Sequence, residues 1–180
     1  MSVHRLTPLP VARATGTLLV AEQVIAPTLA ALRASSGPDG PHEGLVLWLG
    51  RTTGTTSIVM SMICPAARTG PDFVLLDERA VGAASRTARA HSLSVIAQVH
   101  SHPGTDTRHS DGDDNLVLMP FPGMFSLVVA SYGVGSLDPG EGAGLHQYQD
   151  HGWIQVADHQ SYVVVPAPIG PLPAAETGWA

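Results

Sequence analysis

Two runs of apolar residues constrain the fold of this chain more than any other feature of its sequence. Residues 44–51 read GLVLWLGR, and residues 94–99 read SVIAQV. A strand with so few polar positions has no face to present to water, so other elements must cover its sheet on both sides. The sequence therefore predicts a layered α/β or α+β domain in which these two runs are buried strands.

The rest of the chain supplies further strands and two helices around those runs. Apolar stripes at helical spacing predict helices over residues 22–34 and 78–91. Asp77 can cap the second helix, whereas Pro27 either kinks the first or marks its first turn. Shorter runs predict a hairpin about residues 150–152 and strands at 17–20, 55–64, 73–76, 126–132 and 161–165.

Length and composition indicate one domain with an irregular segment at each end. The chain has 180 residues, 44% of them apolar, which is enough for a core of its own. Residues 1–16 show no clear period and carry two prolines, so we expect an irregular arm there, and residues 17–165 would form the domain. Residues 166–180 are rich in Pro, Ala and Gly and are expected to form a flexible tail.

Composition also argues against several classes of protein. The net charge of -6 leaves no basic cluster to neutralise phosphates, so we expect no nucleic-acid partner. No apolar stretch approaches the ~20 residues that span a bilayer, and the first residues lack the pattern of a secretory signal. Cys64 is the only cysteine, which excludes an internal disulfide and fits a reducing cytoplasm. Because Cys64 lies on an apolar run, we expect it to be packed.

Residues 100–113, HSHPGTDTRHSDGD, carry the candidate chemistry. His100 and His102 follow a buried strand, where residues i and i+2 project to the same side, so both imidazoles can bind one ion. Asp113 can supply a third, carboxylate ligand, although Asp111 competes for that role. Three protein ligands leave the fourth tetrahedral position for water, which is typical of a catalytic site with one Zn²⁺ per chain.

Such a site also requires a general base and a group that stabilises the oxyanion. Glu43, at the mouth of the first buried strand, is the candidate base for the zinc-bound water, whose pKa can fall to about 7. Ser110 can donate a hydrogen bond to the oxyanion of a tetrahedral intermediate. His109 is either a bystander on the rim or a substrate contact, and we favour the bystander. Asp114 is expected to cap the turn or helix that follows.

The spacing of these residues resembles a known motif. The pattern His-x-His-x7-Ser-x2-Asp, which marks the JAMM (MPN-domain) metalloproteases, is met by His100, His102, Ser110 and Asp113. Glu43 fits the upstream glutamate of that family, and the order of elements is similar over residues 17–165. The resemblance implies zinc bound by the two histidines and the aspartate, acid/base work by the glutamate, and oxyanion stabilisation by the serine. It also implies a single MPN-like domain with a mixed, curved β-sheet flanked by two or three helices.

The resemblance further implies a function. It predicts a zinc-dependent peptidase or isopeptidase, similar to deubiquitinases, that cleaves after the C-terminal glycine of a ubiquitin-like modifier in deconjugation or precursor processing. That modifier or its conjugates would be the substrate, and its activating and conjugating enzymes would be associated partners. One alternative is a hydrolase that releases an amino acid from the C-terminus of a sulfur-carrier protein. Another is a non-catalytic MPN scaffold, although such members typically lack a ligand or the glutamate, and this chain keeps the whole set.

Overall fold

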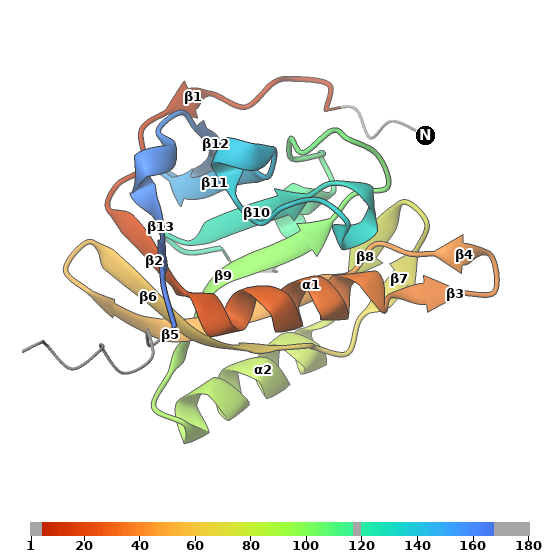
Figure 1. Ribbon diagram of the computed structural model, residues 1–180, viewed down its shortest axis with the longest axis horizontal. Helices are drawn as coiled ribbons and strands as arrows, with labels where there is room; N and C mark the ends of the chain where they lie inside the picture. The colour runs from red at the N-terminus through yellow and green to blue at the C-terminus, as the bar shows by residue number, and fades with distance from the viewer. Residues whose placement is uncertain (1–4, 117–119, 168–180) are drawn as a thin grey trace, which may run out of the picture.

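A computed structural model describes residues 5–116 and 120–167, and its centre is one nine-stranded sheet (Figure 1). In order across the sheet, the strands are β1 (Val11–Ala12), β12 (Gly152–Val156), β11 (Gly144–Gln149), β10 (Phe125–Val129), β9 (Ser94–Ser101), β5 (Leu45–Thr53), β6 (Thr56–Ile63), β2 (Thr17–Ala21) and β13 (Tyr162–Val165). The sheet is mixed, because β9 runs parallel to β10 but antiparallel to β5.

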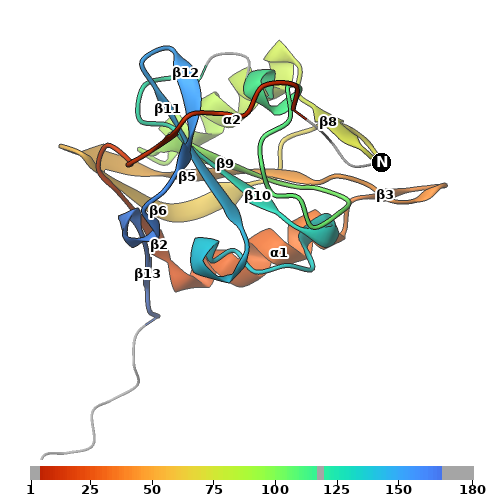
Figure 2. The same ribbon diagram turned by 90° about the horizontal axis from the view of Figure 1, so that it is seen from above.

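Two helices cover the sheet, and short elements connect its strands. Helices α1 (Ile25–Arg33) and α2 (Glu78–Ala90) lie on opposite sides of the sheet in the view from above (Figure 2). The predicted class, a mixed sheet flanked by two or three helices, is confirmed. The remaining described elements are two hairpins, β3 (Ser36–Gly37) with β4 (Gly40–Pro41) and β7 (Arg68–Gly70) with β8 (Phe73–Leu75), and the 3-10 turns η1 (Glu22–Val24), η2 (Asp113–Asn115), η3 (Ser131–Gly133), η4 (Pro139–Glu141) and η5 (His159–Ser161).

Strand β5 explains why the first apolar run has no polar face. Successive side chains of a strand point to opposite faces, so Val46 and Trp48 join the apolar cluster that includes Leu32 of α1. Leu45 and Leu47 join the second cluster, on the side of α2. Both faces of β5 are therefore buried, as the sequence predicts.

The predicted helix boundaries follow local signals. The Asp77 side chain caps α2 by accepting a hydrogen bond of 2.7 Å from the amide of Ala80. Pro27 is the third residue of α1, where its missing N–H has no helical partner to lose, and η1 precedes it. Pro27 therefore marks the first turn of the helix.

Several segments differ from their predictions. The strand predicted at 126–132 ends at Val129, because Ser131 and Tyr132 take left-handed conformations with φ of 53° and 54°. The stretch between α1 and β5, for which no element was predicted, contains the β3–β4 hairpin, and β7 was not predicted either. Cys64 follows β6 and is exposed, so the prediction that it is packed is wrong.

The segments at the two ends are only partly described. Strand β1 lies within the predicted irregular arm and pairs in parallel with β12. Residues 1–4 of that arm and residues 168–180 of the predicted tail lie outside the described residues. None of the helices in the described part of the chain has the length and apolar character needed to cross a membrane.

Candidate metal centre

Strand β9 places the two histidines in the middle of the molecule. It is the fifth of nine strands in the sheet order, and His100 lies between Leu45 of β5 and Val128 of β10. His102 follows directly after the strand, two residues on, so its side chain projects to the same face as that of His100. Both histidines are almost fully buried.

Three side chains with potential ligand atoms converge at this point. The Nε2 atoms of His100 and His102 are 3.2 Å apart. Asp113 Oδ1 lies 3.3 Å from His100 Nε2, and Asp113 Oδ2 lies 3.1 Å from His102 Nε2. Ligands at the usual zinc distances in a tetrahedral site are separated by about 3.3–3.4 Å, so the observed spacing fits one Zn²⁺. Among the described residues, this group alone has the composition and spacing to hold a metal.

Neighbouring groups influence the protonation of the side chains that could bind a cation. The Nδ1 atom of His102 lies 2.8 Å from the carbonyl oxygen of Asp106, which can only accept, so Nδ1 carries the proton and Nε2 offers its lone pair. Burial alone would raise the pKa of Asp113, but the imidazoles of His100 and His102, when protonated, outweigh it and hold that pKa far below its usual range. Asp113 therefore offers a carboxylate between two imidazoles.

Ser110 and Asp113 hold each other in the loop after β9. The amide of Ser110 donates to Asp113 Oδ2 over 2.6 Å, and the amide of Asp113 donates to Ser110 Oγ over 3.2 Å. Because the serine oxygen is the acceptor in the second bond, its own hydrogen is available for another partner. This geometry is compatible with the predicted oxyanion role of Ser110.

Glu43 reaches the same site from the neighbouring strand. Leu45 pairs with His100, and the amide of Ser101 donates to the carbonyl of Gly44, so the continued register places Glu43 opposite His102. Glu43 is only 3% exposed, and its Oε1 atom has no hydrogen-bond partner among the described residues. Burial raises the pKa of Glu43 to about 8. With this pKa, Glu43 is mostly protonated near neutral pH in the metal-free protein, and a cation bound beside it would favour the carboxylate form. As a carboxylate, this unpartnered buried group is suited to hold a water molecule and accept its proton.

One small pocket brings the base and the loop residues together. It has a volume of ≈ 60 Å³, and Glu43, Ser110 and Asp113 are among the residues that line it. Strand β8 forms another wall of this pocket. The structure thus gathers the predicted base, the predicted serine and the ligand Asp113 around one opening.

The backbone around Glu43 is fixed on several sides. Its amide donates to the carbonyl of Gly70 over 2.8 Å, and its carbonyl accepts from Ser35 Oγ over 2.9 Å. The next amide, that of Gly44, donates to the buried Oγ of Ser101 over 2.9 Å. Ser101, the residue between the two histidines, therefore aligns β5 with β9 and positions Glu43.

Two predictions for neighbouring residues, the cap by Asp114 and the rim position of His109, are wrong, and the rival ligand Asp111 lies apart from the site. Asp114 does not serve as a cap, because both its carboxylate oxygens bind Arg5, at 2.8 and 2.7 Å. Asp111 is exposed and faces Arg5 at 3.8 Å, so it is not among the converging ligand atoms. His109 is not on the rim: it is 1% exposed, its Nε2 lies 2.8 Å from Ser126 Oγ, and its ring stacks on His146.

Sequence reasoning did not identify Ser101, Arg5 and Tyr132 as residues that shape the site. Ser101 has a local signal, because alternation along the strand turns it to the face opposite the histidines. Tyr132 donates its amide to the carbonyl of His102 and its hydroxyl to that of Pro71, at 2.8 and 2.9 Å. Arg5 and Tyr132 are distant in sequence from their partners, and no local pattern marks them.

Known proteins match this chain in sequence. The family model described as prokaryotic homologs of the JAB domain matches residues 26–142, more than half of the chain. The chain belongs to this family. The matched part of the JAB domain contains all five predicted site residues, and the resemblance to JAMM (MPN-domain) proteins is confirmed.

Individual relatives of this JAB domain agree. The probable metalloprotease y4jG of Sinorhizobium fredii (strain NBRC 101917 / NGR234) is 29% identical over 109 residues, which cover 58% of this chain and 66% of the relative, just under two thirds of its length. Protein DSY2949 of Desulfitobacterium hafniense has a TM-score of 0.60 at 17% identity and covers 84% of this chain and 93% of its own. A protein of Salinibacter ruber (strain DSM 13855) has a TM-score of 0.52 at 21% identity, with coverages of 85% and 94%. The two structures share the fold, and the family together with the ligand set supports a metallohydrolase.

Proposed function

We propose that this JAB domain is a zinc-dependent peptidase or isopeptidase that cleaves after the C-terminal glycine of a ubiquitin-like modifier. One observation carries the proposal: the ligand atoms of His100, His102 and Asp113 lie within 4.8 Å of one another, and Glu43 is buried beside them. A scaffold without catalysis would have no need for an unpartnered buried carboxyl at this point, since such a group is costly to bury.

Zn²⁺, when bound, supplies a Lewis acid that polarises a carbonyl group and makes a water molecule acidic near neutral pH. The protein's own groups perform the proton transfers. Glu43 accepts the proton of the attacking water on its carboxylate and returns it to the leaving nitrogen. Ser110 donates its free hydroxyl hydrogen to the oxygen on which negative charge develops. The C–N bond breaks, and the products are a free carboxylate and an amine.

Two features of β8 support an extended peptide as the substrate. Strand β8 lines the pocket that contains Glu43, and in the described part of the chain it pairs with β7 alone, so its second edge is open. Phe73 and Leu75 project to one side of β8 and are 39% and 50% exposed. An open strand edge offers main-chain hydrogen bonds to an extended substrate, and exposed apolar side chains offer contacts for alternate residues.

The size of the pocket favours glycine at the cleaved bond. A space of ≈ 60 Å³ between Glu43, Ser110 and Leu116 has little room for a side chain. Ubiquitin-like modifiers end in an extended Gly-Gly tail, which would lie along β8 and place its last carbonyl at the metal. Activating and conjugating enzymes for that modifier are the partners that this proposal implies.

The proposal is tested by hydrolysis assays on zinc-loaded protein. Ubiquitin-like proteins that end in Gly-Gly are joined to a reporter through an isopeptide or a linear bond. Parallel assays use a sulfur-carrier protein with one additional C-terminal amino acid, and fusions whose last glycine is replaced by leucine. Cleavage after Gly-Gly that is lost with the leucine fusions and in Glu43→Gln supports the proposal. Cleavage of the sulfur-carrier substrate alone would support the alternative function. If zinc-loaded protein cleaves none of these substrates, the non-catalytic scaffold is the function that remains.

A further inference from the structure

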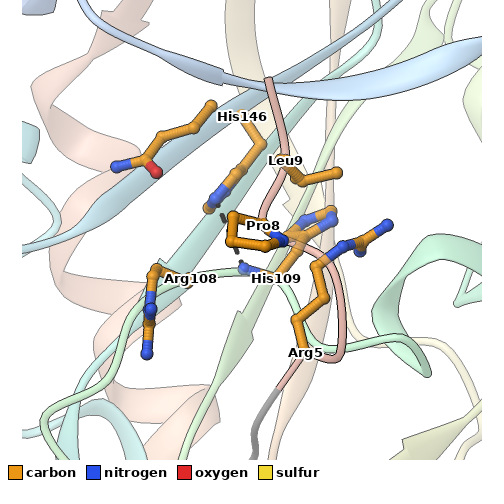
Figure 3. A pocket seen from close by; sticks show the side chains of 7 residues that line it. Arg5, Pro8, Leu9, Arg108, His109 and His146 are labelled. Atoms are coloured by element: carbon orange, nitrogen blue, oxygen red, sulfur yellow. Dashed lines mark hydrogen bonds between the residues drawn. The ribbon is translucent and has the colours of Figure 1, made fainter. Parts of the chain in front are cut away.

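Arg5, Pro8 and Leu9 lie beside Arg108 and His109, in the loop that continues to Ser110 and Asp113 (Figure 3). Arg5 Nη1 donates to Asp114 Oδ1 over 2.8 Å, and Arg5 Nη2 donates to Asp114 Oδ2 over 2.7 Å. Two parallel hydrogen bonds between a planar guanidinium and a carboxylate fix direction as well as distance. The Arg5 side chain is only 18% exposed, so water screens this pair weakly.

Arg5 binds both ends of the loop segment 110–114. Its Nη1 also donates to the carbonyl oxygen of Ser110 over 3.3 Å, at the beginning of the segment, while Asp114 lies at the end. Between these contacts, the amide of Leu6 lies 3.5 Å from Asp111 Oδ2. Asp113, the loop-borne metal ligand, is thus enclosed by contacts from one distant segment of the chain.

The segment that carries Arg5 is itself anchored to the sheet. Arg5 Nε donates to the carbonyl of Thr7 over 2.7 Å, which folds the segment locally. Leu9 packs against the apolar cluster on the side of α2, and the carbonyl of Pro10 accepts from the amide of Gln155 over 2.9 Å. Strand β1 then pairs with β12. Arg5 therefore connects the loop to the edge of the sheet.

The same segment closes the space behind the metal centre. Arg5, Pro8 and Leu9 line a cavity of ≈ 30 Å³ together with His109 and His146, as the close view shows (Figure 3). A cavity of this size holds about one water molecule. The loop has further long-range hydrogen bonds on this side: Trp153 Nε1 donates to the carbonyl of Asp114 over 3.2 Å, the amide of His109 donates to His146 Nε2 over 3.4 Å, and His109 Nε2 lies 2.8 Å from Ser126 Oγ.

We infer that Arg5 is a positioning residue of the metal centre: residues 5–9 form a strap that holds the segment 110–114 in its ligand-binding conformation. The inference rests on the metal centre of the proposed function but not on its substrate. Without Arg5, Asp113 must be ordered as the metal binds, which weakens binding. Groups that support metal ligands typically contribute about 10–100-fold to metal affinity, and we expect about tenfold for Arg5.

The test compares three variants of the full chain. Arg5→Ala removes the strap contact, and Arg5→Lys keeps the charge without the two-pronged geometry. Arg13→Ala is the matched control, because Arg13 is exposed just beyond β1, outside the strap, and its side chain makes no hydrogen bond or ion pair with any described residue. Two measurements are made: hydrogen exchange of the amides of Ser110 and Asp113 in metal-free protein, and Zn²⁺ affinity by competition with a chelator.

We expect Arg5→Ala to accelerate amide exchange at these positions and to weaken Zn²⁺ binding by about tenfold, with Arg5→Lys intermediate and Arg13→Ala unchanged. Arg5→Ala combined with Asp114→Asn should weaken Zn²⁺ no further than either change alone, because both remove the same contact. Equal exchange and equal affinity in Arg5→Ala and Arg13→Ala would overturn the inference. If Arg5→Ala does not fold, Arg5→Lys decides by the same measurements. A wild-type protein that binds Zn²⁺ but cleaves nothing would refute the proposed function and leave this inference standing.

Discussion

His100 and His102 stand at the end of the central strand of the sheet, whereas Ser110 and Asp113 stand on a loop that belongs to no strand. The strand half of the site, which contains His100 and His102, is held because β9 pairs with β5 on one side and with β10 on the other. The loop half of the site, which contains Ser110 and Asp113, is held by side chains from elsewhere in the chain. Arg5 binds Ser110 and Asp114, and Trp153 binds Asp114. Ligands on the strand take their geometry from a two-residue repeat, whereas ligands on the loop depend on residues far away in the sequence.

The two halves should therefore respond differently to substitution. Replacing a proposed ligand on either side should remove the metal, since each would supply part of the same coordination shell. Replacing a supporting residue should affect register and stability on the strand side, but loop order and metal affinity on the loop side.

The largest expected effect is loss of metal, and it should be equal on the two halves. His102→Ala on the strand side and Asp113→Ala on the loop side should both reduce zinc from about one ion per chain to nearly none, because two protein ligands do not retain it. Elemental analysis of the purified variants measures this, with Asp111→Ala as the matched control. If Asp111→Ala loses as much zinc as Asp113→Ala, the assignment of Asp113 as the one carboxylate ligand is wrong.

Glu43 should separate chemistry from metal binding. Glu43→Gln keeps the size of the side chain but cannot accept a proton, so turnover should fall by about 10³-fold while zinc content stays unchanged. Turnover and zinc content are measured on the same preparation. Full activity in this variant would remove Glu43 from the mechanism.

Ser110 should have a smaller effect on turnover, on the loop side. Ser110→Ala removes the donor to the developing oxyanion, and turnover should fall by about 10²-fold. The amide of Ser110, which binds Asp113, is unchanged, so zinc content should remain near that of the wild type. A large loss of zinc in Ser110→Ala would show that the hydroxyl supports Asp113 rather than the substrate.

Ser101 tests the strand side alone. Ser101→Ala leaves the buried amide of Gly44 without its acceptor and should lower the free energy of unfolding by about 1–3 kcal/mol. Denaturant unfolding measures this, with Ser94→Ala, at the exposed start of the same strand, as control. Zn²⁺ affinity should change less than in Arg5→Ala. A larger loss of Zn²⁺ affinity in Ser101→Ala than in Arg5→Ala would contradict the idea that the strand and the loop are supported by different residues.

The smallest expected effect concerns the metal-free protein and its pH dependence. Because the pKa of Glu43 is raised to about 8, the folded protein holds a proton that the unfolded chain releases near the ordinary glutamate pKa of 4.5, so stability falls as pH rises between these values. Glu43→Gln removes that loss. At pH 8.5 with a chelator present, its melting temperature should exceed that of the wild type by about 3 °C, or ~1 kcal/mol for a chain of this size. At pH 5 the two should coincide, and a constant difference at both values would contradict the buried charge.

Much of the fold followed from periodicity along the chain. The continuous apolar run of β5 required cover on both faces, and Asp77 marked the start of α2 because a cap needs only its own local backbone. The left-handed conformations of Ser131 and Tyr132, which end β10 early, have no such signal. Neither is glycine, and their backbones are held by contacts with Gly104 and His102.

By itself, the sequence determined the residues that converge. His100 and His102 share a face because strands alternate, and the spacing to Ser110 and Asp113 matches a motif whose members lie close along the chain. Only the tertiary structure decided what holds and completes the site. The register between β5 and β9 brings Glu43 opposite His102, burial of Glu43 raises its pKa, and Arg5 reaches Asp114 across 109 positions of sequence. Register, burial and long-range pairing depend on how separate segments pack, and no local pattern encodes them.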